Sequence, residues 1–589
     1  MRLEGNLFSK PSVSGMNWIY TESEKDDLVL VKKKLNISNS IANIILNRYP
    51  RMQDLDDLLN TSLKDNIPNP KSLKDLELAV DLVYKSLSTK AKIGILGDYD
   101  VDGCTSAALI HDYFFKIGIN TTVYIPDRIK DGYGVSKRSL DYFCDKKIEL
   151  LITLDCGSND YETISYARNK GIKVIVIDHH EIKKKAKAYS IINPKQDDDK
   201  SNLNHLSTVG LCFIFVLGLQ DKLLRSNYFK IGTMPDLRYF LDIVALGTVC
   251  DLVPIKGLNR IFVKKGLDII NKKIRHGLSI LVEKLDLSNK ITESDLAYYL
   301  GPCINAAGRI GNSYNAFQFL SNNTNTDTDH ITDELIRNNK ERRTLEAIAI
   351  NQAEEIIRKK NILSSNENMF ILIENSSWHP GITGIIASRL LEKFKIPCFV
   401  ISSYKSKSRG SVRTPYSIDA SKILKRLLDL KVIVSGGGHK MAGGFVLNKG
   451  QTSLLREALL TELKKIKFSK IEALKIDSVT DISKINEKLI KDLDLIRPFG
   501  VENKEPTFVI KNVKPIYYNV IGKEKNHISC VLEDIYGLRL NAIAFDVLDN
   551  NIGETILKKN SVHIAGKIKI NEWKKKKTIQ FLIEDIIIL

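Results

Sequence analysis

The stretch 92-KIGILGDYDVDG-103 contains three aspartates within five positions, Asp98, Asp100 and Asp102, directly after a short apolar run. Like charges this close repel one another, so the segment is either a solvated turn or a site where a cation offsets the repulsion. The apolar run predicts a buried strand, and the apolar-rich segment 104–117 that follows predicts a helix. This strand, acidic turn and helix begin a β-α alternation that decides the fold class.

The alternation continues along the chain. Short apolar runs at 121–126, 148–154 and 172–177 are separated by segments with helical patterning. Continuous apolar runs that alternate with helices indicate a parallel sheet covered on both faces. The sequence therefore predicts an α/β domain built on a parallel sheet.

Side chains of the kinds that bind metals or act as acids follow the ends of these runs. A further apolar run, 241–250, also leads into an aspartate and is interpreted as a fourth strand. Because the carboxyl ends of parallel strands line one crevice, we expect these side chains to lie close together. They are Asp98, Asp100, Asp102, Asp155, Asp178, His179, His180 and Asp251.

A single acid after a strand is most often a helix cap. For the whole set, that interpretation requires four separate segments to end in Asp or His by coincidence. Carboxylates buried in this number need neutralising, and oxygen ligands together with imidazole suit Mn²⁺ or Mg²⁺. We therefore expect two divalent ions, an arrangement that stabilises the attacking and leaving oxygens in phosphoester hydrolysis.

Bulk properties bound the setting. A chain of 589 residues suggests about four domains. The formal net charge of +18, from 88 Lys and Arg against 70 Asp and Glu, favours a polyanionic partner such as nucleic acid. The eight cysteines form no C-x-x-C pair, so no zinc ribbon is expected. Without a signal-peptide apolar core or an apolar run of about 18 residues, we expect a cytoplasmic protein that does not enter a membrane.

The motifs together resemble the DHH phosphoesterase family. Residues 98–103, 155–157, 178–180 and 247–251 are similar to its four sequence motifs. Further stretches narrow the resemblance to the branch of single-strand-specific 5′→3′ DNA exonucleases that carry a DHHA1 domain. Cys250 and Cys303 depart from the residues usual at those positions of the family. The further stretches are 301-GPCINAAGRIG-311, 378-WHPGITGIIASRL-390, 410-GSVRT-414, 436-GGGHKMAGG-444 and 497-RPFGVENKEP-506.

The resemblance implies a role for each candidate residue. His180 would donate to a non-bridging oxygen of the cleaved phosphate, and Asp178 would orient a neighbouring histidine. The implied metal ligands are Asp98, Asp100, Asp102, Asp155, His179 and Asp251. The implied substrate-binding residues are Arg309, Ser411 and Arg413 for a 5′-phosphate, and Gly437, Gly438 and His439 for a phosphate of the strand.

The remaining sequence indicates further domains. A long helix at 333–360 is expected to connect two lobes, and about five short alternating strands after 470 suit an OB-fold barrel that binds single strands. Lys569, Trp573 and the lysines 574–577 would supply charge and an aromatic platform there. The expected boundaries are 1–60 for an N-terminal segment, 61–270 for a DHH catalytic domain, 271–365 for a helical connector, 366–465 for a DHHA1 substrate-binding domain and 466–589 for the OB-fold domain.

The function implied is a metal-dependent 5′→3′ exonuclease for single-stranded DNA, acting in repair and recombination. Its implied partners are a DNA strand with a 5′-phosphate, a single-strand-binding protein and a helicase, and a monomer is expected. Two alternatives stay open: a nano-RNase or cyclic-dinucleotide phosphodiesterase of the same family, and a non-catalytic replication scaffold. The C-terminal extension argues against the former, and the complete ligand set argues against the latter.

Overall fold

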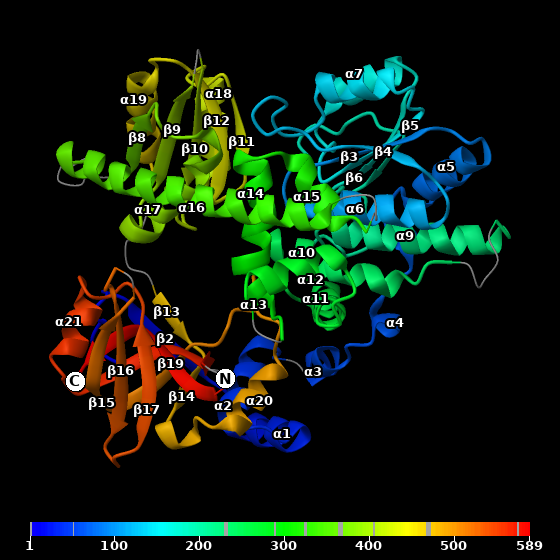
Figure 1. Cartoon of the computed structure of the whole chain (residues 1–589). Coiled ribbons are helices and arrows are strands. Elements are labelled where there is room, and N and C mark those ends of the chain that lie inside the picture. Colours follow the sequence, from blue (N-terminus) through cyan, green and yellow to red (C-terminus); the bar gives the residue numbers. More distant parts are fainter. Residues whose placement is uncertain are drawn as a thin grey trace. The chain divides into compact units, whose positions relative to one another are not determined.

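The computed structural model describes residues 3–50, 52–228, 234–287, 290–322, 327–362, 369–404, 407–466, 473–522, 524–573 and 576–589 (Figure 1). The chain divides into two compact units. One comprises residues 63–468, and the other combines residues 1–62 with 469–589. No helix in the described part of the chain is long and apolar enough to cross a membrane.

The predicted parallel sheet is confirmed in the unit of residues 63–468. Its five strands run in the order β4-β3-β5-β6-β7, and every neighbouring pair is parallel. The central strands are buried along their whole length, as expected for a sheet covered on both faces. The strands are β3 (Ile93–Gly97), β4 (Thr121–Tyr124), β5 (Leu150–Leu154), β6 (Lys173–Ile177) and β7 (Ser190–Ile192).

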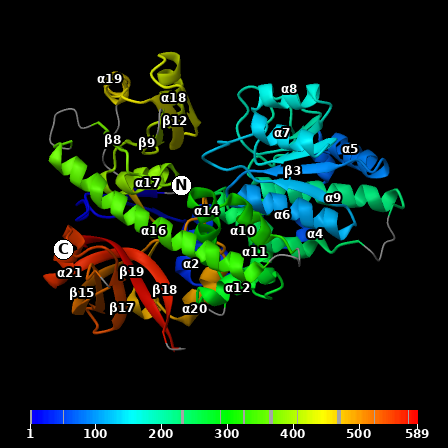
Figure 2. The ribbon, with the colours of Figure 1, turned by 45° about the horizontal axis from the view of Figure 1, so that its top comes forward.

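Helices cover both faces of this sheet (Figure 2). Alternate side chains of β5 point to opposite faces, so Ile152 packs with α6 and α9 whereas Leu151 packs with α7 and α8. The acidic turn connects the buried strand β3 to the helix α6, most of whose residues are also buried. The helices are α5 (Leu76–Ser88), α6 (Val101–Lys116), α7 (Lys137–Asp145), α8 (Tyr161–Asn169) and α9 (Thr208–Arg225).

The prediction of a fourth strand before Asp251 is wrong. Residues 241–250 form the helix α10 (Leu241–Cys250), and its residues 241–249 are buried on every side. A continuous apolar run has no periodicity that distinguishes a buried strand from a buried helix. Asp251 therefore reaches the crevice from the C-terminus of a helix and not from the end of a strand.

Further helices connect the parallel sheet to a second α/β layer. The longest is α16 (Thr328–Lys359), which extends beyond the predicted 333–360 at its N-terminal end and runs from the first layer to the second (Figure 1). The N-cap Asp327 accepts a hydrogen bond from the backbone of His330, which explains where the helix begins. The others are α11 (Gly257–Ile270), α12 (His276–Lys284), α14 (Gly301–Ile310) and α15 (Ser313–Leu320).

The second layer is a five-stranded sheet in the order β11-β12-β10-β9-β8. The pairs β11–β12, β12–β10 and β10–β9 are antiparallel, and β9–β8 is parallel. Its strands are β8 (Ile371–Asn375), β9 (Cys398–Tyr404), β10 (Lys407–Arg413), β11 (Ser435–Gly438) and β12 (Ala442–Asn448). Its helices are α17 (Thr383–Phe394), α18 (Ala420–Asp429) and α19 (Thr452–Leu463).

The predicted C-terminal barrel is confirmed in the other unit. Five strands close on themselves in the order β15-β16-β17-β19-β18, because β18 also pairs with β15. Lys574 and Lys575 of the predicted lysine run lie outside the described residues, as does the side chain of Trp573. The strands are β15 (Phe508–Ile521), β16 (His527–Asp534), β17 (Arg539–Ala544), β18 (Val562–Trp573) and β19 (Lys576–Ile588).

The N-terminal segment folds with this barrel, which the sequence did not predict. Strands β1 (Leu3–Asn6) and β2 (Asn17–Glu22) form one sheet with β13 (Ala473–Ile476). The indole nitrogen of Trp18 donates to the buried Asp585 carboxylate over 2.8 Å. The two ends of the sequence thus build one core.

A buried arginine joins the elements beneath the acidic turn. The Nε of Arg275 donates to Asp242 on α10 over 2.7 Å, and its Nη1 donates to Asp112 on α6 over 3.2 Å. The same Nη1 also donates to the carbonyl of Leu320 in α15. All three charged side chains are almost completely buried. Arg275 therefore holds together the two helices that carry Asp102 and lead to Asp251.

We predict that Arg275→Met lowers the free energy of unfolding of the unit of residues 63–468 by about 3–5 kcal/mol, because two buried carboxylates lose their counter-charge. Urea denaturation followed by circular dichroism measures the change. Arg238→Met is the control, since Arg238 forms an exposed ion pair with Asp236 and its loss should leave the transition in place. Equal stability of Arg275→Met and the wild type would contradict this role.

Candidate active site

Three of the predicted acids follow directly on neighbouring strands. The backbone N–H of Asp98 continues the ladder of β3 by donating to Leu154, and that of Asp155 continues β5 by donating to Ile177. Asp178 does the same after β6. The three carboxyl groups therefore meet at one edge of the sheet, as expected from the sequence.

These residues form adjoining groups of metal-type ligands. Three sets have ligand atoms that all lie within 4.8 Å of one another. Asp155 and His179 each belong to two of the sets, and the two oxygens of the Asp155 carboxylate allow it to bridge two ions. The sets are Asp98 with Asp100 and Asp155, Asp102 with His179 and Asp251, and Asp155 with His179 and His180.

Backbone geometry shapes the acidic turn. Asp100 is the N-cap of α6, and its carboxylate accepts a hydrogen bond from the backbone of Gly103 over 3.0 Å. A Cβ at Gly103 would lie 2.5 Å from the backbone of Asp98, so any side chain there would displace the turn. The glycine of this motif thus allows the acids to converge.

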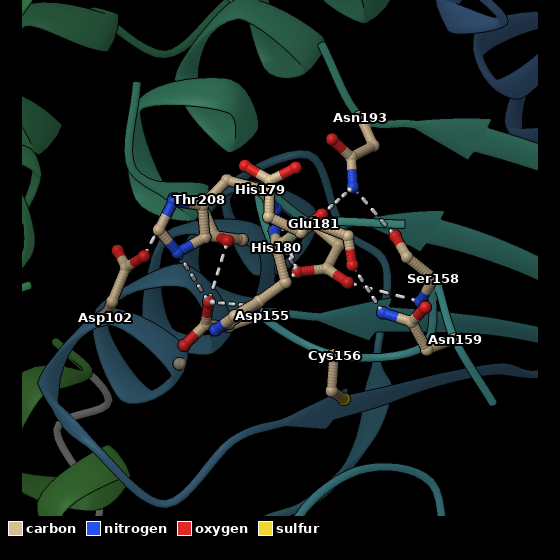
Figure 3. A network of polar contacts seen from close by, with 12 residues as sticks. Asp102, Asp155, Cys156, Ser158, Asn159, His179, His180, Glu181, Asn193 and Thr208 are labelled. Carbon is tan, nitrogen blue, oxygen red and sulfur yellow. Dashed lines mark hydrogen bonds and ion pairs between the residues drawn. The ribbon is translucent and has the colours of Figure 1, made fainter. Parts of the chain in front are cut away.

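The N-terminus of α9 holds two of the acids, and the sequence reasoning missed it. The backbone N–H groups of Thr208 and Val209 donate to the two oxygens of Asp102 over 2.7 and 3.0 Å. The Thr208 hydroxyl donates to Asp155 over 2.9 Å (Figure 3). Ser207 and Thr208 directly before an apolar helix are a helix-start signal that could have identified this contact.

Asp178 is directed at a neighbouring histidine. Its Oδ1 lies 2.8 Å from the Nδ1 of His180 and also accepts the backbone N–H groups of both histidines. Burial opposes ionisation of Asp178, but its side-chain hydrogen bond with His180, the charge of His180 and the proximity of His179 outweigh burial and hold the pKa of Asp178 below the usual range. Burial likewise opposes charge on His180, yet the hydrogen bond and charge of Asp178 raise its pKa. Asn193 fixes the same segment by donating to the His180 carbonyl over 2.9 Å (Figure 3).

The other carboxylates carry charge that the protein does not neutralise. Burial, followed by repulsion from Asp100, raises the pKa of Asp102 to about 7. Burial and neighbouring carboxylates also raise the pKa of Asp155 and Asp251. Within the described residues, the Nε2 of His179 and the Oδ2 of Asp251 are buried, 3.3 Å apart, and have no hydrogen-bond partner. Burial lowers the pKa of His179 to about 3, which leaves its imidazole neutral and able to bind a cation.

The predicted phosphate residues lie in the second layer and on α14. Ser411 and Arg413 share one face of β10, where the Ser411 hydroxyl lies 3.0 Å from that of Thr383 and the Arg413 Nε donates to Ser388 over 3.1 Å. Arg309 reaches this layer through a 3.3 Å hydrogen bond to the Gly381 carbonyl. Thr383, Gly381 and Ser388 all belong to the first turns of α17 or precede it directly. The structure thus brings Arg309, Ser411 and Arg413 around one helix start.

Two further arginines, Arg128 and Arg342, lie near this group and were not predicted from the sequence. Burial, and then the charges of Arg128, Arg342 and Arg413, lower the pKa of Arg309 to about 10. Arg128 lies 5.0 Å over the ring of Tyr99 in the acidic turn. Neither arginine carries a sequence signal, because a single Arg is usually solvated surface. Arg342 is paired with Glu346 over 2.7 Å. Arg128 and Arg309 act on Asp98 and Asp100, so the cationic region adjoins the carboxylates through these two arginines.

The glycine-rich turn brings the second layer to His180. The ring of His439 stacks on that of His180 with centroids 5.7 Å apart. Gly437 and Gly438 precede it in β11, and a Cβ at Gly438 would lie 2.2 Å from the carbonyl of Ala442. The Tyr133 hydroxyl also lies 3.1 Å from the Nδ1 of His180. All predicted site residues except Arg309, Ser411 and Arg413 therefore surround the acidic edge.

Comparison with known proteins agrees with this arrangement. Family profiles match the DHH family N-terminal domain at 92–248, the DHHA1 domain at 366–466 and the RecJ OB domain at 476–585. The single-stranded-DNA-specific exonuclease RecJ of Salmonella typhimurium is 30% identical, with 90% of this chain and 92% of the relative covered. This chain belongs to the RecJ family. RecJ of Haemophilus influenzae is 29% identical, with 95% of this chain and 99% of the relative covered.

Solved RecJ structures share the fold. RecJ from Thermus thermophilus in complex with Mn²⁺ has a TM-score of 0.78 at 23% identity and covers 96% of this chain and 79% of its own. An exonuclease RecJ bound to manganese has a TM-score of 0.57 at 27% identity and covers 68% of this chain and 96% of its own. The expected arrangement of DHH, DHHA1 and OB domains is thereby confirmed.

The donor set of this RecJ family member fits two divalent cations. The candidate ligands include buried carboxylates with raised pKa, such as Asp155, and the neutral imidazole of His179. The unpaired nitrogen of that imidazole faces an unpaired oxygen of Asp251. Oxygen ligands with a single type of nitrogen donor suit Mn²⁺ or Mg²⁺. Cations at these positions would remove the repulsion that raises the pKa of the carboxylates.

We predict that Mn²⁺ raises the melting temperature of the metal-free protein, because the ion binds the folded carboxylate cluster and not the unfolded chain. Saturation at a hundredfold excess over Kd corresponds to about 2.7 kcal/mol. Differential scanning fluorimetry with and without EDTA measures the shift. Asp155→Ala should lose most of it, and Asp221→Ala, at an exposed helix position, should keep it. A full shift in Asp155→Ala would exclude this cluster as the binding site.

Proposed function

We propose that this chain is a metal-dependent exodeoxyribonuclease that degrades single-stranded DNA from a 5′-phosphorylated end and releases nucleotides during DNA repair and recombination. The observation that carries the proposal is the meeting of two opposite kinds of site within one unit. A cluster of buried carboxylates lies against His180 and His439, and a group of arginines with Ser411 lies beside it. The family relatives named single-stranded-DNA-specific exonucleases support the same substrate.

The residues divide the chemistry between them. Two bound cations would neutralise the carboxylates and stabilise the attacking and leaving oxygens. The proposed ligands are Asp98, Asp100, Asp102, Asp155, His179 and Asp251. His180, held by Asp178 and biased towards its charged form, donates to a non-bridging oxygen of the scissile phosphate as negative charge develops there.

The arginine group would select the end of the strand. Arg309, Ser411 and Arg413 would bind the terminal 5′-phosphate, with Arg413 supplying a guanidinium that matches phosphate geometry. His439, Gly437 and Gly438 would hold the next phosphate against the acidic edge. A strand whose terminal 5′-phosphate is bound by the arginine group places a bond near that end against the catalytic residues. Cleavage therefore starts from the 5′ end.

The proposal extends to the setting of the enzyme. It acts as a cytoplasmic monomer, since one unit of one chain supplies every residue of the proposed site. A single-strand-binding protein would deliver the substrate and a helicase would generate it. The domain boundaries proposed are those expected from the sequence. Residues 1–60 are assigned to the same folded unit as the OB-fold domain and not to a separate domain.

We predict that His180→Gln lowers kcat on a 5′-phosphorylated, 3′-labelled single strand by roughly 10²–10³, because one donor to the developing charge is lost. A ladder that shortens from the 5′ end with Mn²⁺, and is absent on a blunt duplex, is the expected wild-type result. His276→Gln, remote from the site at the start of α12, is the control. Hydrolysis of dinucleotides alone would favour the nano-RNase alternative, and binding without cleavage would favour a scaffold.

We predict that Arg413→Ala removes the preference for a 5′-phosphate over a 5′-hydroxyl. The wild type should have a KM roughly tenfold or more lower for the phosphorylated strand, since one charge-assisted contact contributes about 1.5–3 kcal/mol. Competition between the two labelled strands measures the ratio. Arg426→Ala on α18 of the same layer should keep the preference. A preference retained in Arg413→Ala would place the terminal phosphate elsewhere.

A further inference from the structure

A lysine-rich loop leaves the active site directly after the two histidines. The loop, residues 181–189, connects His180 to β7 and contains four exposed lysines, Lys183, Lys184, Lys185 and Lys187. The charge of Lys185 acts on the Asp198 carboxylate, which sets Lys185 apart from the other three. A run of lysines is usually a solvated surface without a task. Three observations distinguish this loop: it is anchored, three of its lysines form no ion pair with a carboxylate of the described residues, and an aromatic ring lies among them. We call residues 181–189 the lysine loop.

The anchoring comes from the turn that follows Asp155. The side chain of Asn159 accepts the backbone N–H groups of Lys183 and Lys184 over 2.7 and 3.3 Å, and donates to the carbonyl of Glu181 over 2.8 Å (Figure 3). The backbone of Ala186 donates to Ser158, and the Ala186 side chain is buried. The loop is therefore held in one conformation by the same segment that carries a proposed metal ligand.

The lysines surround a tyrosine and lack acidic partners. The ammonium of Lys184 lies 4.3 Å from the ring centre of Tyr161, and that of Lys187 lies 5.2 Å from it. Among the described residues, carboxylates form ion pairs with the nearby Lys74 and Lys195 but with none of Lys183, Lys184 and Lys187. Both ammonium groups lie over the ring of Tyr161, so a base that stacks there displaces them towards the phosphates. The ring and the lysines then supply the two features that bind single strands, stacking for a base and charge for the phosphates.

The residues near the lysine loop indicate where the loop lies relative to the bound DNA. Burial lowers the pKa of His439, and the charges of His180, Lys195 and Lys183 lower it further. Burial and the charge of Arg128 lower the pKa of Arg413, in the proposed terminal phosphate site. The lysine loop begins directly after His180, whose ring stacks on that of His439, so the loop adjoins the histidine end of the site. Arg128 adjoins the terminal phosphate end.

We propose that Lys183, Lys184, Lys187 and Tyr161 bind the DNA strand on the 3′ side of the cleaved bond, with the lysines on its phosphates and Tyr161 stacked on a base. This inference rests on the proposed function, because the direction of the strand follows from the terminal phosphate site. The loop would hold the remaining strand after each nucleotide leaves. It would therefore favour repeated cleavage of long strands over that of short ones.

Binding of a strand to the full-length, metal-free protein tests the proposal without cleavage. Fluorescence anisotropy with an oligonucleotide of about 20 residues, in EDTA, gives Kd between about 50 and 200 mM salt. The triple variant Lys183→Gln, Lys184→Gln, Lys187→Gln should reduce the slope of log Kd against log salt by about 2, since each phosphate contact on a single strand contributes about 0.7. Tyr161→Ala should weaken binding roughly tenfold and leave the slope unchanged, and Tyr161→Phe should restore the affinity.

The matched control uses lysines at the other end of the same sheet. Lys146, Lys147 and Lys170 are exposed at the ends of α7 and α8, before the amino ends of β5 and β6, and two of them also lie over tyrosine rings. Their triple substitution by Gln should keep the wild-type slope. An unchanged slope in the loop variant, or an equal loss in the control, overturns the proposal.

The affinity for a 5′-phosphorylated trinucleotide tests whether the lysine loop binds the DNA on the 3′ side of the cleaved bond. This affinity should fall far less in the loop variant than the affinity for the long strand, because the trinucleotide ends near the cleaved bond. An equal loss for both would put the loop at the 5′ end and overturn the placement. If the wild type binds the long strand but does not cut it with Mn²⁺, the proposed exonuclease function fails, and the salt slopes still decide whether the lysine loop binds DNA.

Discussion

The mutual repulsion of buried carboxylates is the constraint on which the rest of this structure depends. Burial and neighbouring charge raise the pKa of Asp98, Asp102, Asp155 and Asp251. Bringing these carboxylates together in their charged form therefore destabilises the folded chain. The scaffold resists this repulsion through rigid elements. The strand ladder fixes two of the acids, the N-terminus of α9 holds Asp102, and the buried Arg275 ties together the helices behind them. Cations that relieve the repulsion would then be bound in a prepared geometry.

The arginines of the site also place like charges close together, but of the opposite sign to the carboxylates. Burial, and then the charges of neighbouring arginines, lower the pKa of Arg309, just as burial and neighbouring charge raise the pKa of the acids. An anion relieves one set and a cation relieves the other. A phosphodiester strand with bound metal ions satisfies both at once, because its phosphates neutralise the arginines and share the cations. This complementarity makes nucleic acid a fitting substrate on physical grounds, independent of family resemblance.

The interpretation of 241–250 shows where sequence patterns stop being informative. The run is apolar throughout, and a helix buried on every side produces the same pattern as a buried strand. The prediction that Asp251 joins the site was nevertheless useful, since either element ends at the same crevice. Thr208 and Arg128 were missed for different reasons. Ser207 and Thr208 carry a helix-start signal that could have identified Thr208. The contribution of Arg128 lies in proximity to other charges, which leaves no trace in the local pattern.

The sequence by itself determined the parallel sheet, the acids at its carboxyl edge and the C-terminal barrel, because period-two and apolar patterns depend on local burial. It also determined which side chains were candidates for phosphate binding. Only the tertiary structure decided that Arg309 from α14 joins Ser411 and Arg413 on β10, and that Trp18 packs on the strand that ends the chain. Those contacts join residues far apart in the chain. Their energies depend on the packing of whole elements, which no local pattern encodes.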